Sequence, residues 1–138
     1  MNKFFSPSPI ALRQGIALVR IIVGALIVYH GQEVFNPQLM SEYSNWDTFD
    51  KSNAKLMVYV GKSSELIAGI SLLFGLFTRV GSLLTMGTLS YITFFIGSGK
   101  FWYEDQHPFM FVLFGLLFLL TGPGAWSIDG LIFNEQKE

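Results

Sequence analysis

The sequence of 138 residues contains no cysteine. Without thiols, the chain by itself cannot form or exchange a disulfide, carry a persulfide, ligate an iron–sulfur cluster through cysteine or attach a c-type haem. Charge is also scarce, because only 14% of the residues are charged, against about 25% in a typical soluble domain. So few charges cannot coat a compact, water-exposed surface. The composition therefore indicates a chain surrounded by lipid.

Basic runs are missing as well. The net charge is −1 and no cluster of lysine and arginine occurs, which argues against nucleic acid as a partner. Apolar residues are abundant instead: 51% of the chain is hydrophobic, with 14 Phe and 14 Gly. Glycine is more frequent in transmembrane helices than in soluble ones. The length and the absence of repeats indicate a single domain over residues 1–138.

Four apolar segments occur, at residues 12–31, 56–77, 80–97 and 107–121. A membrane-spanning helix needs about 20 apolar residues to cross about 30 Å of hydrocarbon. The first three segments approach that length, whereas the fourth reaches only about 22 Å and requires local thinning of the bilayer. Arg13 and Arg20 interrupt the first segment, so we interpret it as a retained helix and not a cleaved leader. The sequence predicts an all-α, integral membrane four-helix bundle with a polar loop between the first two helices.

The connections between the segments carry further predictions. Residues 75–79 predict a tight helical hairpin, in which Gly75 ends one helix and Thr78 caps the next. Residues 32–55 form a long polar loop that is expected to cover one end of the bundle. Pro37 should interrupt any continuous helix there. Aromatic residues recur in this loop at every third position, which predicts one face of a short interfacial helix. They are Tyr43, Trp46 and Phe49.

The loop charges favour one orientation. Four spans place both termini on the same side of the membrane, together with four basic residues: Lys3, Arg13, Arg79 and Lys137. The other side holds Lys51, Lys55 and Lys100. Basic residues are enriched in cytoplasmic loops. We therefore expect a multi-pass protein of the inner (cytoplasmic) membrane with both termini in the cytoplasm.

Apart from Arg13 at the start of the first segment, three charged residues lie inside the apolar spans: Arg20, Lys62 and Glu65. Each such charge costs about 2.5–3.5 kcal/mol on insertion scales. Counted from the same membrane face, Arg20 lies about 16 Å deep and Glu65 about 14 Å deep. The matching depths predict an ion pair between them, and Lys62 can reach the same carboxylate from one turn away. Such a cluster either fixes the register of the bundle or handles protons or a polar headgroup.

Glycines support close contact between the first two helices. Gly61 and Gly69 lie one turn on either side of Glu65, and Gly24 and Gly31 share a face with Arg20. Small residues at such spacing let two helix backbones approach each other.

The two histidines, His30 and His107, are expected at the same membrane face, with Glu33 one turn beyond His30. Imidazole beside carboxylate could serve a quinone carbonyl or a proton relay. The alternative is that both are ordinary interfacial histidines. Two histidines without ligand spacing are too few for a metal site, so no metal ligands are predicted.

Taken together, several of these features resemble the DoxX family, a group of small four-helix membrane proteins of bacteria and archaea. The resemblance extends from about residue 12 to 130. It rests on Arg20, His30, Gly31, Lys62, Glu65, the segment from Gly75 to Arg79, and the terminal Gly122, Pro123, Trp126 and Asp129. The loop at residues 32–55 has no counterpart in it.

The resemblance implies partners and a cofactor. Family members include a subunit of an archaeal thiosulfate:quinone oxidoreductase and membrane partners of soluble sulfurtransferases and superoxide dismutase. It implies that Arg20, His30, Lys62, Glu65 and Arg79 contribute a site, and that quinone or a partner subunit carries the electrons. Three functions stay open at this point. The chain is a membrane subunit of a quinone-linked oxidoreductase complex, a non-catalytic assembly subunit with other chains or copies of itself, or a small transporter.

Overall fold

The computed structural model describes residues 3–133, and throughout this range the regular structure is helical. Four major helices confirm the predicted all-α fold: α1 (Leu12–Gly31), α3 (Ala54–Phe74), α4 (Thr78–Tyr91) and α5 (Gln106–Thr121). Shorter elements are η1 (Lys3–Phe5), η2 (Gln32–Phe35), α2 (Pro37–Ser44), the π-helical turn η3 (Ile92–Ile96) and α6 (Ile128–Ile132). Three continuous helical stretches are long and apolar enough to cross a membrane, and α5 is a shorter apolar helix. Lys137, used above for orientation, lies outside the described residues.

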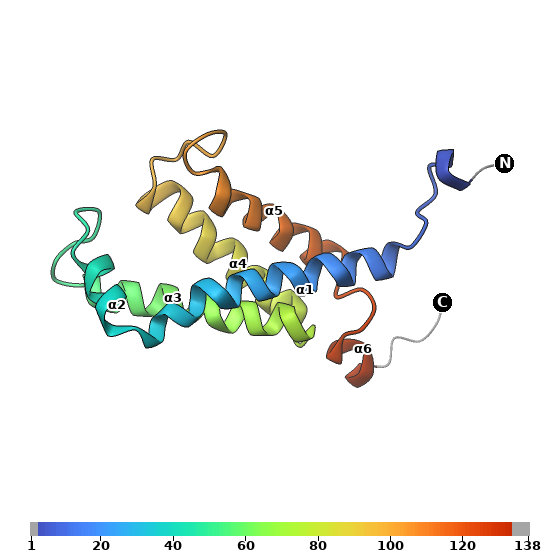
Figure 1. Ribbon diagram of the computed structural model, residues 1–138, viewed down its shortest axis with the longest axis horizontal. Helices are drawn as coiled ribbons and strands as arrows, with labels where there is room; N and C mark the ends of the chain where they lie inside the picture. Colours follow the sequence, from blue (N-terminus) through green and yellow to red (C-terminus); the bar gives the residue numbers. More distant parts are fainter. Residues whose placement is uncertain (1–2, 134–138) are drawn as a thin grey trace.

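The major helices form two pairs, α1 with α3 and α4 with α5 (Figure 1). The pairs lie close together at the end that holds the α3–α4 turn and α6. They separate toward the opposite end, which holds α2 (Figure 1). The first turn of α1 and the helix α6 lie toward the same end, as an even number of spans requires.

Glycine allows α1 and α3 to pack against each other. A Cβ atom on Gly24 would collide with the backbone of Leu73, and one on Gly31 would collide with the backbone of Leu66. From the other side, a Cβ on Gly69 would come within 2.6 Å of the backbone nitrogen of Val28. The predicted close contact is therefore confirmed at three of its four glycines. The exception is Gly61, which has open space around it.

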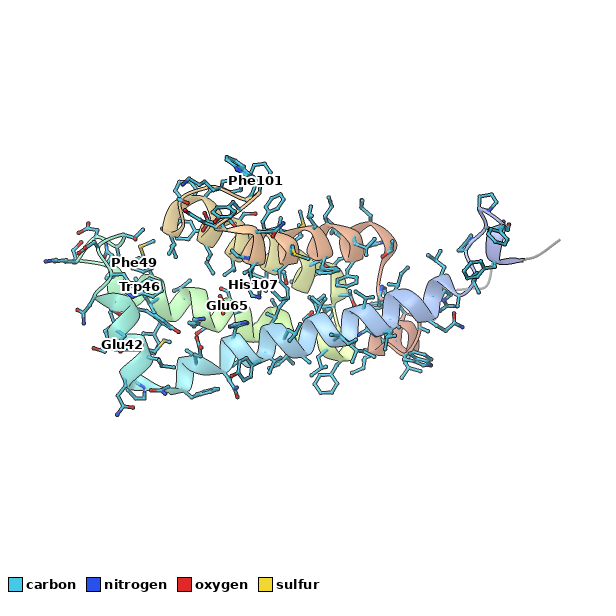
Figure 2. All side chains as sticks on the ribbon, turned by 45° about the horizontal axis from the view of Figure 1, so that its top comes forward. Glu42, Trp46, Phe49, Glu65, Phe101 and His107 are labelled. Atoms are coloured by element: carbon cyan, nitrogen blue, oxygen red, sulfur yellow. The ribbon has the colours of Figure 1, made fainter. Side chains whose placement is uncertain are left out.

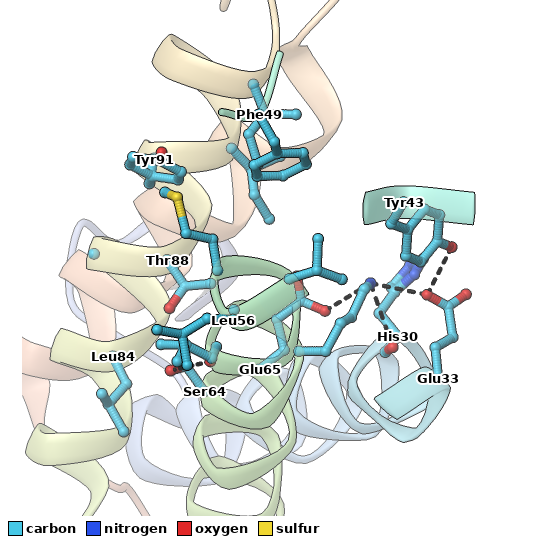
Figure 3. A pocket seen from close by; sticks show the side chains of 18 of the residues that line it. His30, Glu33, Tyr43, Phe49, Leu56, Ser64, Glu65, Leu84, Thr88 and Tyr91 are labelled. Carbon is cyan, nitrogen blue, oxygen red and sulfur yellow. Dashed lines mark hydrogen bonds and ion pairs between the residues drawn. The ribbon is translucent and has the colours of Figure 1, made fainter. Parts of the chain in front are cut away.

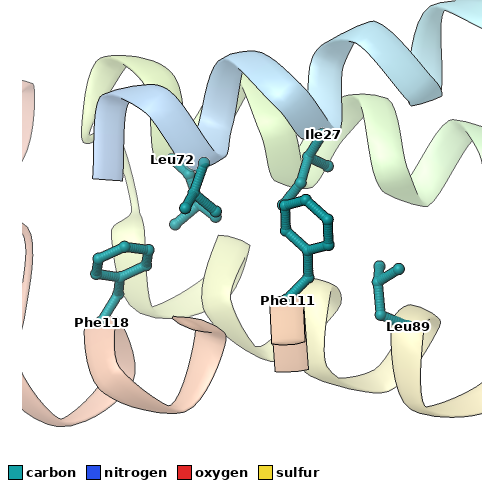
Figure 4. Close-up of a cluster of buried hydrophobic side chains, with 6 residues drawn as sticks. Ile27, Leu72, Leu89, Phe111 and Phe118 are labelled. Atoms are coloured by element: carbon teal, nitrogen blue, oxygen red, sulfur yellow. The ribbon is translucent and has the colours of Figure 1, made fainter. Parts of the chain in front are cut away.

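A cluster of apolar side chains holds the two pairs together (Figure 4). Leu72 of α3 and Phe118 of α5 are fully buried in it. The other members are Val23, Ile27, Leu89 and Phe111. Because lipid tails are as apolar as these side chains, the cluster stabilises the fold through van der Waals packing and not through exclusion of water.

The polar loop after α1 folds into two short helices. The helical stretch that begins with α1 ends before Asn36. The Asn36 side chain caps α2, because it accepts hydrogen bonds from the backbone N–H groups of Gln38 (3.1 Å) and Leu39 (3.3 Å). Pro37 is then the first residue of α2, a position where its missing N–H costs nothing. The interruption expected at Pro37 is thus confirmed.

The prediction of one interfacial helix over Tyr43, Trp46 and Phe49 is wrong, because the helix is shorter than expected. Helix α2 ends at Ser44, so only Tyr43 is helical. The three rings nevertheless line one pocket, because the segment after α2 turns back over α3. Trp46 and Phe49 lie near α2, at the end where the helix pairs separate (Figure 2).

The hairpin between α3 and α4 forms as predicted, but its cap is different. Gly75 ends α3 with a left-handed backbone conformation (φ 64°), which glycine adopts without steric cost. Thr78 does not cap α4, because it is already the first helical residue and a cap must precede the helix. The carboxylate of Asp129 accepts the hydrogen bonds instead, from the backbone N–H groups of Phe77 (2.6 Å) and Thr78 (2.8 Å).

Candidate functional site

Arg20 is fully buried, and within residues 3–133 its guanidinium group donates only to backbone carbonyls. Nε donates to Pro123 (2.7 Å), Nη1 to Leu72 (2.5 Å) and Leu73 (3.2 Å), and Nη2 to Ala125 (3.2 Å) and Trp126 (2.9 Å). The predicted ion pair between Arg20 and Glu65 is therefore wrong.

The register of α1 against α3 explains the error. Gly31 lies against the backbone of Glu65 and Leu66, whereas Gly24 lies against Leu73. Glu65 is thus level with the end of α1, and Arg20 is level with the end of α3. The depth estimate assumed that residue 56 is level with Gly31. In fact α3 extends beyond that level by the stretch from Ala54 to Glu65, about 16 Å of helix.

Arg20 instead holds the end of α3 and the turn after α5 together. Several of the residues that carry the resemblance to the DoxX family lie around it, and we call this region the Arg20 joint. At the end of α3, the Gly75 N–H donates to the carbonyl of Leu72. The guanidinium group of Arg20 supplies further donors to the carbonyls of Leu72 and Leu73 and to the turn after α5. Gly75 must be glycine here, since a Cβ would come within 2.8 Å of the Arg20 Nη1 atom. Asp129 caps α4 beside this joint. The left-handed Gly122 and the neighbouring Pro123 turn the chain toward Arg20, while Arg79 is exposed on α4.

A second group of charged residues lies away from Arg20, where the end of α1 meets α3. Figure 3 shows this group from close by. The ammonium group of Lys62 lies 2.8 Å from Oε2 of Glu33 and 3.1 Å from Oε2 of Glu65. Its third contact is the backbone carbonyl of His30, at 3.5 Å. The Tyr43 hydroxyl donates to Oε2 of Glu33 (2.9 Å). We call Glu33, Tyr43, Lys62 and Glu65 the charged cluster.

The charged cluster becomes more buried from Glu33 inward. The exposed fraction of the side chain falls from 24% at Glu33 to 17% at Lys62 and 5% at Glu65. Lys62 has three donors, and all three have acceptors. Burial raises the pKa of the Tyr43 hydroxyl, and its hydrogen bond to Glu33 raises this pKa further. Two carboxylates and one ammonium group leave the cluster with a formal charge of −1.

The charged cluster forms one end of a pocket with a volume of about 770 Å³ (Figure 3). Its walls come from α3, from α4 with η3, and from the loop after α2. Apart from the charged cluster and His30, the lining residues are Trp46, Phe49, Leu56, Met57, Val58, Val60, Gly61, Ser64, Leu83, Leu84, Gly87, Thr88, Tyr91, Ile92 and Ile96. Leu56, Val60 and Leu83 are each more than half exposed. The pocket is therefore open at the side, where these apolar residues of α3 and α4 are exposed.

The two histidines meet, as their predicted topology requires. The rings of His30 and His107 lie 5.8 Å apart in an edge-to-face arrangement, which joins α1 to the start of α5. His30 lines the pocket, and His107 contacts Phe111 (5.3 Å between ring centroids). Within residues 3–133, no cluster of three or more candidate ligands could hold a metal ion.

Other acidic residues that the sequence places beside His107 belong to a separate loop. Asp105 accepts hydrogen bonds from the backbone of Ser98 (3.0 Å) and Lys100 (3.1 Å). The exposed Glu104 accepts from the Ser98 hydroxyl (2.8 Å) and the Lys100 ammonium group (3.4 Å). These two carboxylates organise the loop before α5 and do not reach the charged cluster.

Sequence reasoning missed three parts of the site. It predicts only an aromatic role for Tyr43, whose hydroxyl donates a hydrogen bond to Glu33. The contribution of α4, including Thr88 and Tyr91, gave no signal, because the third apolar segment carries no charge. The π-helical turn, which places Ile92 and Ile96 at the pocket, has no recognisable sequence pattern.

Comparison with known proteins supplies a family. The family model described as DoxX matches residues 15–98, which include most of α1, all of α3 and α4, and the charged cluster. A protein of Haemophilus influenzae described as uncharacterized is 24% identical over 127 residues, covering 87% of this chain and 92% of that protein. No solved structure matches the chain significantly.

Proposed function

Since this chain belongs to the DoxX family of membrane proteins, we propose that it is the quinone-binding membrane subunit of an oxidoreductase complex. The observation that supports this proposal is the pocket between α3 and α4, apolar along its walls and charged at one end. Such a shape suits a ligand with a polar ring and a long hydrocarbon tail. The sideways opening suits a ligand that arrives from the bilayer.

A quinone ring needs hydrogen-bond donors at its carbonyls and protons on reduction. His30 lines the pocket, and within the described chain its imidazole forms no hydrogen bond, so it is available to a carbonyl oxygen. Reduction to the quinol takes up two electrons and two protons. We assign the proton transfer to the charged cluster, in which Lys62 links the more exposed Glu33 to the buried Glu65. The electrons come from a redox partner protein.

A pair of tryptophan substitutions tests the proposal. Leu84→Trp fills the pocket, whereas Leu113→Trp adds the same ring to an exposed position of α5. Purified wild type and Leu113→Trp should retain quinone and bind decylubiquinone in nanodiscs, and Leu84→Trp should lose both. If no variant binds quinone and other chains co-purify in fixed proportion, the chain is an assembly subunit instead.

We also propose that both termini face the cytoplasm and that the pocket end with α2 faces the periplasm. The basic residues Arg13 and Arg79, which lie at the opposite end from the pocket, support this orientation. Because the chain has no native cysteine, single cysteines report topology directly. Asp47→Cys should react with an impermeant maleimide from outside the cell, and Arg79→Cys should not. The reverse pattern would overturn the orientation.

A further inference from the structure

The pocket combines excess negative charge with aromatic walls. We infer that it binds lipophilic organic cations, such as amines or quaternary phosphonium and ammonium ions with an apolar body. This activity goes beyond the proposed quinone site, and it does not depend on electron transfer.

The first argument is the balance of charges at the polar end of the pocket. Among the described residues that line the pocket, Lys62 is the only lysine or arginine, and it faces both Glu33 and Glu65. Arg20 is occupied by carbonyls at the other end of the bundle. Only one oxygen of Glu65, Oε2, meets Lys62 within the described residues, although the side chain is almost fully buried. An uncompensated charge at low dielectric is costly, so a cation in the pocket gains the attraction that Lys62 cannot fully supply.

The second argument is that aromatic side chains line the pocket. Tyr43, Trp46, Phe49 and Tyr91 line the pocket, and the rings of Tyr43 and Trp46 lie 5.0 Å apart. Cations bind favourably over the faces of such rings, and quaternary ammonium ligands are recognised in this way. The Lys62 ammonium group already lies 5.3 Å from the centre of the Tyr43 ring. The wall thus favours positive charge independently of the carboxylates.

The remaining wall selects the rest of the ligand. Leu56, Val60, Leu83 and Leu84 offer hydrocarbon surface, and outside the charged cluster and His30 the lining residues carry no charge that could pair with a distant charged group. A hydrophilic cation gains little there, whereas a cation with an apolar body contacts the whole wall. An anionic amphiphile of the same size meets the negative end and is rejected.

The test uses two ions of nearly equal size and opposite charge, tetraphenylphosphonium and tetraphenylborate. Binding to the purified protein in nanodiscs is measured by equilibrium dialysis, with empty nanodiscs subtracted. Wild type should bind the phosphonium ion saturably and the borate ion no more than empty nanodiscs do. Decylubiquinone should compete with the phosphonium ion if both occupy this pocket.

Variants locate the binding. Glu65→Gln and Glu33→Gln each remove one negative charge and should weaken phosphonium binding at least about tenfold, which corresponds to about 1.4 kcal/mol. Glu104→Gln, the same change at an exposed carboxylate outside the pocket, should leave binding unchanged. Thermal unfolding of each variant shows that it is folded; if Glu65→Gln does not fold, Glu33→Gln decides. Equal binding of the two ions by wild type, or unchanged affinity in the folded variants, would overturn the inference.

Discussion

The carboxylate of Glu33 and the ammonium group of Lys62 lie 2.8 Å apart, which fastens the segment after α1 to α3. The same ammonium group holds Glu65 at 3.1 Å. Lys62 is therefore the central residue of the charged cluster, and both carboxylates depend on it for charge compensation.

Removing Lys62 should destabilise the protein strongly. Lys62→Met leaves two carboxylates facing each other without a cation, and breaking a buried ion pair in this way costs about 3–5 kcal/mol. The double variant Lys62→Met/Glu65→Gln should recover part of the loss, because it also removes the buried charge. Thermal unfolding in nanodiscs measures both effects. Lys100→Met is the control, since its pair with Glu104 is half exposed and should contribute little.

Arg20 should matter for stability and not for ligand binding. Arg20→Met removes a donor from five carbonyls, of which that of Leu72 keeps the Gly75 N–H. A buried unpaired acceptor costs about 1–3 kcal/mol, so the free energy of unfolding should fall by at least about 2 kcal/mol. Arg20→Lys should recover only part, because an ammonium group lacks the planar fork of guanidinium. Arg13→Met, at an exposed position of the same helix, is the control. A folded Arg20→Met protein with normal stability and no ligand binding would contradict this assignment.

Two glycines of α1 should respond oppositely to alanine. Gly31→Ala places a Cβ against the backbone of Leu66 and should push α1 away from α3, which lowers stability and disturbs the charged cluster. Gly15→Ala meets nothing within 4 Å, so it should be neutral or stabilise α1 by up to about 1 kcal/mol. Unfolding in nanodiscs distinguishes the two. A neutral Gly31→Ala would show that the helices are not in close contact there.

Tyr43 should give the protein a pH-dependent stability at alkaline pH. Its pKa is raised above the ordinary value of 10.0 by burial and by the hydrogen bond to Glu33. The neutral hydroxyl therefore contributes stability that is fully present below pH 10.0 and is lost as the pH rises through the folded-state pKa. The difference in tyrosinate absorbance between wild type and Tyr43→Phe reports this titration. A difference curve with its midpoint at or below pH 10.0 would contradict it.

Much of the fold could be predicted from local sequence properties. The spans follow from apolar runs, the hairpin from Gly75, and the α1–α3 contact from the spacing of Gly24, Gly31 and Gly69. Hydropathy and glycine spacing are properties of a single segment and its near neighbours, so they hold whatever the rest of the chain does. The contact of Lys62 with Glu65 could also be predicted from local sequence, because residues three apart on a helix are always neighbours.

The candidate site could not be predicted in the same way, because it depends on contacts between segments that are far apart in the sequence. Arg20 and Glu65 have comparable depth only if α1 and α3 end at the same level, and the glycine contacts set a register in which they do not. The pairing of Glu33 with Lys62 required the chain to turn at Asn36, so that the segment after α1 lies over α3.

The sequence alone determined that this chain is helical, apolar and able to span a membrane, since these follow from composition and periodicity. It also determined that Arg20, Lys62 and Glu65 must find partners, because buried charge is costly in lipid. Apart from the local contact of Lys62 with Glu65, only the tertiary structure decided which partners they have. Ion pairs and hydrogen bonds form only when the two groups lie within a few ångströms of each other. The register of one helix against another, together with the separation of the two helix pairs, fixes which groups come that close. That separation also leaves the apolar pocket beside Lys62. The pocket is lined by several segments, so it could not be predicted from any one of them.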